Sequence, residues 1–449
     1  MDLNNAREYM TKLLSLAPSY GFEDAEVRYD SDKSMGVEIL HGEVSSFENS
    51  TEQGLSFRGK LGSQLGGAST TVFDDASMEF LLKEAKENAL ILDDEDEDFI
   101  YCDPENSKLT SDQLSGNSYK NDYSRFSTLG LELEKEILAA DSRIKDVDYL
   151  SLSCSEGPFL MMNTKGLDMY KDADTVTIVA AIRGEENGVV KTAEYFWFGN
   201  DIDKFDKDEF VKTIVKRLTS RFGAKSVKSA SYDIILGNEA MISMLSTFFG
   251  VFSSYTMQKG ISLLADKEGE KIASDKLTIK EIPMYEKALI KVPFDTEGVI
   301  TQEKAIINEG VFETALYNLK TANKAGRKST GNGYKGAVSY SNVVVEEGSK
   351  SFDELCRELG DGLYITELSG LHAGVNEISG DFSLLCEGFL IKDGKVDHPV
   401  EQITVADNFF NVLQKISCVG NDTISYPVAK GEMFSPSVII SNVSVSGEE

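Results

Sequence analysis

The sequence predicts an α+β fold that is rich in β-sheet and large enough for more than one domain. Amphipathic helical periodicity is confined to a few segments, whereas runs of alternating, β-branched or aromatic residues occur along most of the chain. The turn sequences Asn308-Glu309-Gly310 and Asp393-Gly394 stand between apolar runs and predict antiparallel hairpins. Helices and antiparallel strands that are grouped, without strict alternation, are typical of α+β architectures.

The first element is a helix over residues 3–17, because apolar residues recur there every three or four positions and Pro18 and Gly21 follow. Four strand-like segments come next and predict a small antiparallel meander with turns at 41–43 and 52–54. The acidic run 93–98 predicts a solvated loop, because six adjacent carboxylates repel one another. Further helices are expected at 76–92, 124–140 and 206–222, and further strands at 147–155, 174–183 and 188–198.

The length of 449 residues suggests about three domains, although two large ones would fit as well. A boundary is expected near 223–231, where Ala, Ser and Lys predominate and a new strand-to-helix pattern begins. We therefore predict an N-terminal α+β domain at 1–100, a middle α+β segment at 101–225 and a large sheet-rich C-terminal domain at 226–449.

The net charge of −30 argues against direct binding to nucleic acid or to an anionic membrane. The most apolar stretch, residues 242–252, is too short to span a bilayer, and the acidic N-terminal segment lacks the apolar core of a signal peptide. The five cysteines are widely spaced, which excludes a CxxC centre and suits a reducing compartment. We expect a cytoplasmic protein.

Few residues of the usual catalytic types are available. The chain has three histidines, His41, His372 and His398, none of them one helical turn from another, so the common paired-histidine zinc site is absent. His372 lies in a loop among glycines and polar residues. Two interpretations of it are open: a functional imidazole, or a structural histidine that caps a turn.

A basic segment interrupts this acidic chain. From Thr314 to Val345 there is no Asp or Glu. The glycines of this segment match nucleotide-binding patterns only formally, because a strand and not a helix is expected after them. Either the segment is a donor-rich loop that holds a carboxylate or a peptide backbone, or it is a basic surface that pairs with acidic neighbours in the same fold. Its cations are Lys320, Lys324, Arg327, Lys328 and Lys335.

Several long blocks, in order and over nearly the whole chain, resemble the TldD/TldE family, whose TldE member is also called PmbA and was once labelled a modulator of DNA gyrase. They include GLSFRGKLGSQLGGAST, PFDTEGVITQEKAIINEGVF, LKTANKAGRKSTGN and GLYITELSGLHAGVNEISGDFSLLCEGFLIKDGKVDHPV. The resemblance implies a mixed, sheet-rich, two-part fold with a large β-rich C-terminal domain. It also implies a dimer that encloses a cavity.

The family is similar in role to a two-chain zinc peptidase, in which the TldD-type chain carries an HExxxH motif and the TldE-type chain does not. Asn238, Glu239 and Ser243 stand at the positions of that motif here, so this sequence resembles the second type. The resemblance implies no cofactor in this chain and zinc on a TldD-like partner. Cys418 lies one position away from a cysteine ligand of the relatives, and that role is not transferred to it.

The implied activity is hydrolysis of unfolded or leader-like peptides, with this chain shaping the chamber. As a subunit of a metallopeptidase complex, it is expected to be inactive by itself. The alternative is a non-enzymatic peptide-binding or adaptor protein, as the older gyrase label suggests. The implied partners are a TldD-like subunit and a peptide substrate, with a homodimer also open. The residues expected to line the chamber or the subunit contact are Ser329, Thr330, Asn332, His372, Asn376 and Asp381.

Overall fold

The computed structural model describes residues 2–92 and 99–448, which form two compact units. The first consists of Met1–Thr219 with Glu297–Ile300, and the second of Ser220–Thr296 with Thr301–Glu449. Strands from both 1–100 and 101–225 join one sheet of the first unit. The division of the chain into three segments stays a prediction, as does the solvated loop at 93–98, which lies outside the described residues.

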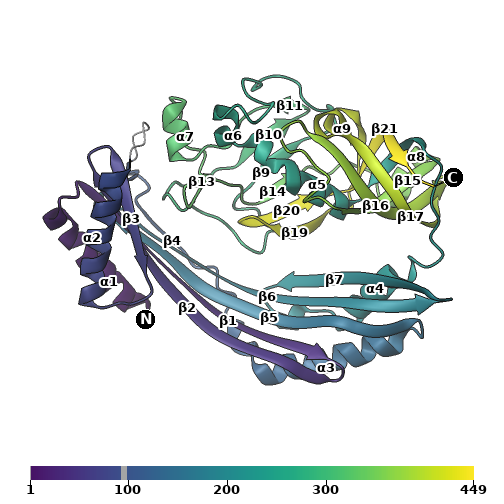
Figure 1. Ribbon diagram of the computed structural model, residues 1–449, viewed down its shortest axis with the longest axis horizontal. Helices are drawn as coiled ribbons and strands as arrows, with labels where there is room; N and C mark the ends of the chain where they lie inside the picture. Colours follow the sequence, from purple (N-terminus) through teal and green to yellow (C-terminus); the bar gives the residue numbers. More distant parts are fainter. Residues whose placement is uncertain (1, 93–98, 449) are drawn as a thin grey trace. The chain divides into compact units, whose positions relative to one another are not determined.

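The first unit is one curved, seven-stranded sheet with helices along it (Figure 1). The sheet order is β3-β2-β1-β5-β6-β4, and β7 pairs with the second half of β6. Its helices are α1 (Leu3–Leu16), α2 (Asp75–Ile91), α3 (Tyr123–Ala140) and α4 (Lys207–Thr219). Its strands are β1 (Asp24–Leu40), β2 (Glu43–Leu61), β3 (Gln64–Thr70), β4 (Lys108–Ser111), β5 (Ile144–Asn163), β6 (Asp168–Glu186) and β7 (Val189–Gly199).

The predicted meander is confirmed at one turn and wrong at the other. His41 and Gly42 both have positive φ and join β1 to β2. Residues 52–54 do not turn: they continue β2, with Gly54 paired to Asp30 of β1. Glycine in a strand interior is permitted, and the long antiparallel ladder with β1 outweighs its weak local preference for a turn.

The four helices cover one face of this sheet. Val27 and Tyr29 of β1 pack in one core with α1 and α2, and Ile39, on the same face of β1, lies against Gly130 of α3. Tyr195 and Trp197 of β7 contact Phe210 and Phe205 around the start of α4. Successive side chains of a strand point to opposite faces, so the polar residues of β1, Glu26, Arg28, Asp30 and Asp32, lie on the other face.

The second unit contains two six-stranded sheets and a short ribbon of β12 and β13 (Figure 1). Its helices are α5 (Asn238–Phe248), α6 (Ser254–Gln258), α7 (Leu319–Lys324), α8 (Phe352–Leu359) and α9 (Phe409–Lys415). Its strands are β8 (Ala230–Leu236), β9 (Ile279–Glu281), β10 (Lys304–Asn308), β11 (Val311–Phe312), β12 (Gly333–Tyr334), β13 (Ala337–Val338), β14 (Val343–Val345), β15 (Gly362–Ser369), β16 (Asp381–Lys392), β17 (Lys395–Asn408), β18 (Ile416–Val419), β19 (Ile424–Val428), β20 (Gly431–Ser435) and β21 (Val438–Ser446).

One sheet has the order β11-β10-β9-β14-β20-β19, and the other β17-β16-β15-β8-β21-β18. Because β17 also pairs with β21, the second sheet closes on itself. The α5 side chains Met241, Leu245 and Phe248 lie in the large core with inward residues of both sheets. Parallel and antiparallel pairs coexist, as in β8 with β15 and β15 with β16, and the predicted α+β, sheet-rich class is confirmed.

Both predicted hairpins are confirmed. Glu309 and Gly310 join β10 to β11, and Asp393 and Gly394 join β16 to β17, all four with positive φ. The continuous strand expected after Gly336 is wrong, since β13 and β14 are two short strands with different partners. Among the described residues, no helix combines the length and the apolar character needed to cross a membrane.

Candidate functional site

The positions that resemble a zinc motif lie at the start of α5, directly after β8. Asn238 is the first residue of the helix, and its side-chain Nδ2 donates to the backbone oxygen of Asp422 (2.8 Å). Its backbone N–H donates to Ser437 Oγ (3.2 Å), and Ser437 Oγ in turn donates to Asp422 Oδ2 (2.7 Å). The side chain of Asn238 therefore fixes the helix start to the turn after β18.

Glu239 and Ser243 are half-buried on the same helix. Ser243 Oγ donates to the backbone oxygen of Glu239 (2.9 Å), one turn earlier, so its hydroxyl is engaged by its own helix. Zinc in proteins is held by thiolate, imidazole and carboxylate, and of the three motif positions Glu239 alone offers such a group. In the part of the chain that the structure describes, no three His, Cys, Asp or Glu side chains converge as metal ligands would. These residues do not fit a zinc ion.

Cys418 lies on the other side of the sheet from α5. Its half-buried side chain packs with Ile235 and Leu355, on the side that α8 covers. The neighbours of Ile235 on β8, Ile234 and Leu236, point to the α5 side, as strand alternation requires. Cys418 and the core-facing side chains of α5 therefore lie on opposite sides of this sheet.

The glycine-rich loop after α7 is held in place by its own hydroxyl side chains. Ser329 Oγ donates to the backbone oxygen of Tyr317 (3.0 Å). Thr330 Oγ1 accepts from the Tyr317 N–H (2.7 Å) and lies 2.7 Å from Asn332 Oδ1, to which it can donate. Both hydroxyls thus connect the loop to Tyr317, two residues before the start of α7.

Asn332 is 4% exposed and reaches a buried carboxylate, that of Glu281 on β9. Its Nδ2 lies 2.9 Å from both carboxylate oxygens. Glu281, itself 1% exposed, also accepts from Lys304 Nζ (2.6 Å) and from the backbone N–H and hydroxyl of Ser341 (2.7 and 2.8 Å). The expected site residue Asn332 is therefore an internal anchor of the loop.

Glu281 and Lys304 were not among the predicted site residues, although the sequence carries one signal for Glu281. Leu277, Ile279 and Glu281 alternate toward the interior of the fold, so a charged residue falls on an inward position. Such a residue needs a partner, because burying a lone carboxylate is costly. The partner Lys304 lies on the neighbouring strand, 23 residues away in sequence.

The second expected group lies in the loop between β15 and β16. His372 and Asn376 are exposed, and Asn376 Oδ1 accepts from the N–H groups of Ile378 and Ser379 (3.0 and 3.1 Å), closing a turn. Asp381 accepts from the Asn408 amide (2.9 Å) and from the Ser379 hydroxyl (2.7 Å). These two hydrogen bonds hold the pKa of Asp381 below its usual value.

Among the described residues, no hydrogen bond or ion pair joins these three residues to Ser329, Thr330 or Asn332. The structure thus places the six expected residues in two separately braced loops. It engages five of the six in hydrogen bonds, and His372 is exposed in the part of the chain described. Their role at a chamber or a subunit contact stays a prediction.

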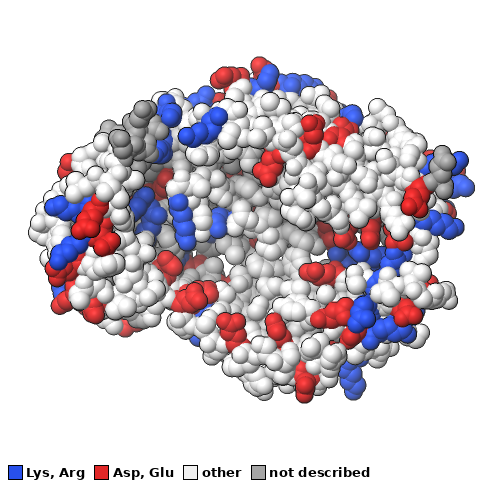
Figure 2. All heavy atoms as spheres, in the orientation of Figure 1, with Lys and Arg blue, Asp and Glu red and all other residues white. Residues whose placement is uncertain are grey.

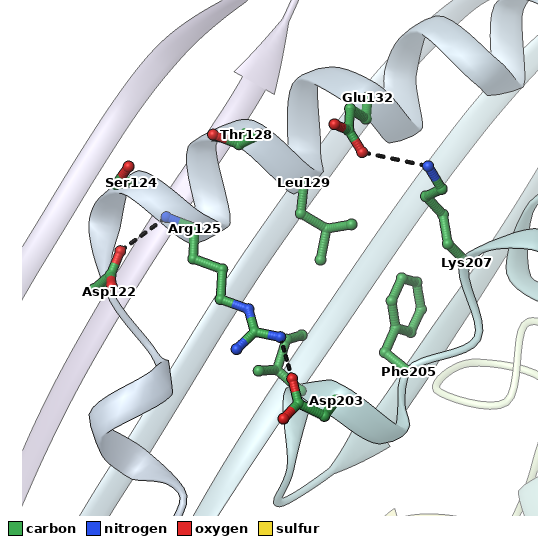
Figure 3. A pocket seen from close by; sticks show the side chains of 10 residues that line it. Asp122, Ser124, Arg125, Thr128, Leu129, Glu132, Asp203, Phe205 and Lys207 are labelled. Atoms are coloured by element: carbon green, nitrogen blue, oxygen red, sulfur yellow. Dashed lines mark hydrogen bonds and ion pairs between the residues drawn. The ribbon is translucent and has the colours of Figure 1, made fainter.

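The first unit carries an open hollow of about 570 Å³ between α3 and the segment before α4 (Figure 3). Leu129, Ile202 and Phe205 supply apolar surface, while Arg125 pairs with Asp203 and Lys207 pairs with Glu132 (3.3 Å). Hydrogen bonds from Arg125 and then Lys120 lower the pKa of Asp203 to about 2. Asp203 is therefore ionised at neutral pH and cannot act as a general acid there.

Two family models match this chain. Residues 229–447 match the PmbA/TldA metallopeptidase C-terminal domain, and residues 25–89 match the PmbA/TldA metallopeptidase domain 1. The first match covers almost all of the second unit and includes α5, the glycine-rich loop and Cys418. The second covers β1 to β3 and most of α2.

Relatives and solved structures agree with these models. Metalloprotease PmbA of Escherichia coli O157:H7 is 28% identical over 71% of this chain and 69% of its own length, and a PmbA homolog of Haemophilus influenzae is 25% identical over 98% and 96%. A proposed modulator of a DNA gyrase from Thermotoga maritima has a TM-score of 0.88 and 27% identity, over 98% of this chain and all of that one. TldE from Thermococcus kodakarensis shares the fold, with a TM-score of 0.86, 22% identity and the same coverage.

Proposed function

Because the chain belongs to the PmbA/TldD metallopeptidase family, we propose that it is the subunit without metal of a two-chain peptidase that cleaves unfolded or leader-like peptides. A TldD-type partner with an HExxxH motif would supply the zinc and its activated water. This chain would shape the chamber and bind the polypeptide, and it would work in the cytoplasm.

The proposal rests chiefly on the side chains at the start of helix α5. Asn238 and Ser243 stand where the metal-bearing relatives have histidines, and their side chains are used in hydrogen bonds to Asp422 and Glu239. Helix α5 is intact, well buried and built into the core, so the fold is retained while the metal ligands are absent.

The first unit supports the peptide-binding part of the proposal. One face of its seven-stranded sheet carries the four helices, and the other carries polar residues of β1, of which Glu26 and Arg28 are buried and Asp30 is exposed. Within the described residues, β3 and β7 each pair with one strand of this sheet and form its edges. An extended polypeptide can add to such an edge through main-chain hydrogen bonds, which do not depend on one side-chain sequence.

The test is to measure metal content by mass spectrometry and cleavage of an unfolded peptide, for the chain alone and after mixing with a TldD-type partner. We expect no stoichiometric zinc on the isolated chain, and chelator-sensitive cleavage only in the mixture. A partner with its HExxxH glutamate changed to glutamine is the control for the source of the activity. One tightly held zinc per isolated chain would overturn the proposal.

Variants of this chain then test its contribution. Asn332→Ala in the mixture is expected to lower cleavage through disorder of the loop, whereas Asn323→Ala, an exposed asparagine on α7, is the matched control. Peptide binding without cleavage in any mixture would instead support a non-enzymatic adaptor. This alternative is consistent with the description of the Thermotoga protein as a gyrase modulator.

A further inference from the structure

Four lysines on the second unit form what we call the basic surface: Lys259, Lys328, Lys335 and Lys430. All four are exposed. Within the described residues, none of them has a carboxylate oxygen at ion-pair distance. In a chain with 75 acidic and 45 basic residues, a group of cations without acidic partners is unexpected on charge alone.

The fold brings these lysines together from four segments. Lys259 follows α6, which packs on α7 through hydrogen bonds from Gln258 Nε2 and Ser254 Oγ to Thr321 (2.8 Å each). Lys328 comes from the loop after α7. Lys335 lies in the turn of β12 and β13, which Asn318 Nδ2 ties to the start of α7 (3.2 Å to the oxygen of Gly336). Figure 2 shows Lys and Arg side chains over α7.

Lys430 joins the group from the turn between β19 and β20. Its Nζ lies 3.7 Å from the centre of the Tyr334 ring, and Lys335 Nζ lies 5.8 Å from the same ring. An aromatic face attracts cations but does not neutralise them. Two ammonium groups held at one ring without a counter-ion therefore form a site of positive potential that an anion would stabilise.

Arg327, next to Lys328, forms an ion pair within the fold, in contrast to the four lysines. Arg327 forms an ion pair with Glu268 while its guanidinium lies over Tyr317. The sequence left open whether the basic segment pairs with acids of its own fold, and for Arg327 it does. For Lys328 and Lys335 the structure gives no such partner, which leaves them available to an outside group.

The lysines also project from a fixed base. Between Lys328 and Lys335, the loop is held by Thr330 to Tyr317 and by Asn332 to the buried Glu281. A preorganised loop pays less conformational entropy when a ligand binds. An anionic ligand fits these lysines, because each ammonium offers three donors and no acceptor, and in an unmodified polypeptide the anionic group is a carboxylate.

We propose that the basic surface binds an acidic segment of the polypeptide that the protein acts on, an inference that rests on the proposed function. A second copy of this chain would also carry a net charge of −30 and would be repelled by the first, which favours a short acidic segment as the occupant. A nucleic acid would extend beyond it onto a surface of net negative charge. At about 0.1 M salt the Debye length is about 10 Å, so an anion at this surface responds mainly to the charges close to it.

The test measures fluorescence anisotropy of a fluorescein-labelled dodecapeptide of alternating Glu and Ser, added to the isolated full chain in 0.1 M salt. The variant is Lys328→Glu with Lys430→Glu. The matched control is Lys392→Glu with Lys395→Glu, two exposed lysines that face each other across the β16 and β17 hairpin of the same unit. We expect the first variant to weaken binding at least about five-fold and the control to stay within about two-fold, because screened charge effects are local.

Four further measurements separate the alternatives. The same peptide with Gln for Glu is expected not to bind, and 0.5 M salt is expected to abolish binding of the acidic peptide. Equal weakening in both variants, or tighter binding of a twelve-nucleotide oligothymidylate at the same salt, would overturn the proposal. So would a change in self-association, seen by sedimentation, without a change in peptide binding. Because no partner or cleavage is involved, failure here is distinct from failure of the peptidase proposal.

Discussion

Glu281 and Lys304 lie opposite each other on β9 and β10, with Lys304 Nζ 2.6 Å from the Glu281 carboxylate. The side chains are 1% and 11% exposed, so the pair is shielded from water. The Asn332 side chain of the glycine-rich loop donates a hydrogen bond to Glu281. The buried ion pair therefore holds this loop in position. Its energetic role can be measured directly.

Removing one member of this pair is expected to cost far more than removing both. Lys304→Met leaves a buried carboxylate without its cation, which typically costs about 3 to 5 kcal/mol of unfolding free energy. The double variant Glu281→Gln with Lys304→Met should recover part of that loss. Urea unfolding followed by circular dichroism measures all three differences.

The control for this experiment is Lys280→Met. Lys280 is the next residue along β9, and its ion pair with Glu346 is much more exposed, so we expect a change of about 0 to 1 kcal/mol. Equal losses in Lys304→Met and Lys280→Met would contradict a special role for the buried pair.

Asn332→Asp should destabilise the loop strongly. The new carboxylate would face Glu281 at hydrogen-bond distance, and two like charges in a buried site repel each other. We expect a loss of about 2 to 4 kcal/mol in unfolding free energy. Asn323→Asp, on an exposed position of α7, should change it by less than about 0.5 kcal/mol. Increased hydrogen exchange at 329–341 in Asn332→Asp alone would locate the effect.

Gly388→Ala is expected to disrupt β16. A Cβ at this position would overlap the backbone oxygen of Tyr364 on the neighbouring β15, and backbone cannot move aside as a side chain can. The expected cost is about 2 to 4 kcal/mol. Gly250→Ala is the control, because nothing lies within 4 Å of its added Cβ and its φ is unstrained. Similar unfolding midpoints for the two variants would argue against the close approach of β15 and β16.

Acid should weaken the first unit through Asp141. The Arg143 side chain and backbone N–H donate to this carboxylate and lower its pKa to about 2. A carboxylate with a lowered folded-state pKa adds stability above its unfolded value near 3.9, and this contribution is lost as pH falls toward 2. Asp141→Asn should therefore show a smaller drop in stability between pH 5 and pH 2.5 than the unmodified chain.

Trp197, the one tryptophan of the chain, lies in β7 of the same unit and reports its unfolding by fluorescence. The comparison variant is Asp208→Asn, an exposed acid in the first turn of α4. A pH dependence in Asp141→Asn as steep as that of Asp208→Asn would contradict the assignment.

Local signals in the sequence were sufficient for much of the fold. The 3.6-residue periodicity of 3–17 gave α1, and Asp393-Gly394 gave the β16 and β17 hairpin, because these features depend on neighbours in the chain. The error at 52–54 has the opposite cause. The local sequence around Gly54 favours a turn. In the fold, Gly54 instead pairs with Asp30 on β1, more than 20 residues away in sequence.

For the candidate site, the sequence by itself determined which metal ligands are missing. The amide of Asn238 and the hydroxyl of Ser243 cannot replace the imidazoles that bind zinc, whatever the conformation. Only the tertiary structure decided where the remaining residues act. It placed Cys418 across the sheet from Glu239, joined Asn332 to Glu281, and brought Lys430 to Tyr334 beside Lys335. Residue chemistry is a property of each side chain, whereas partners, burial and local potential arise from long-range strand pairing that no local pattern encodes.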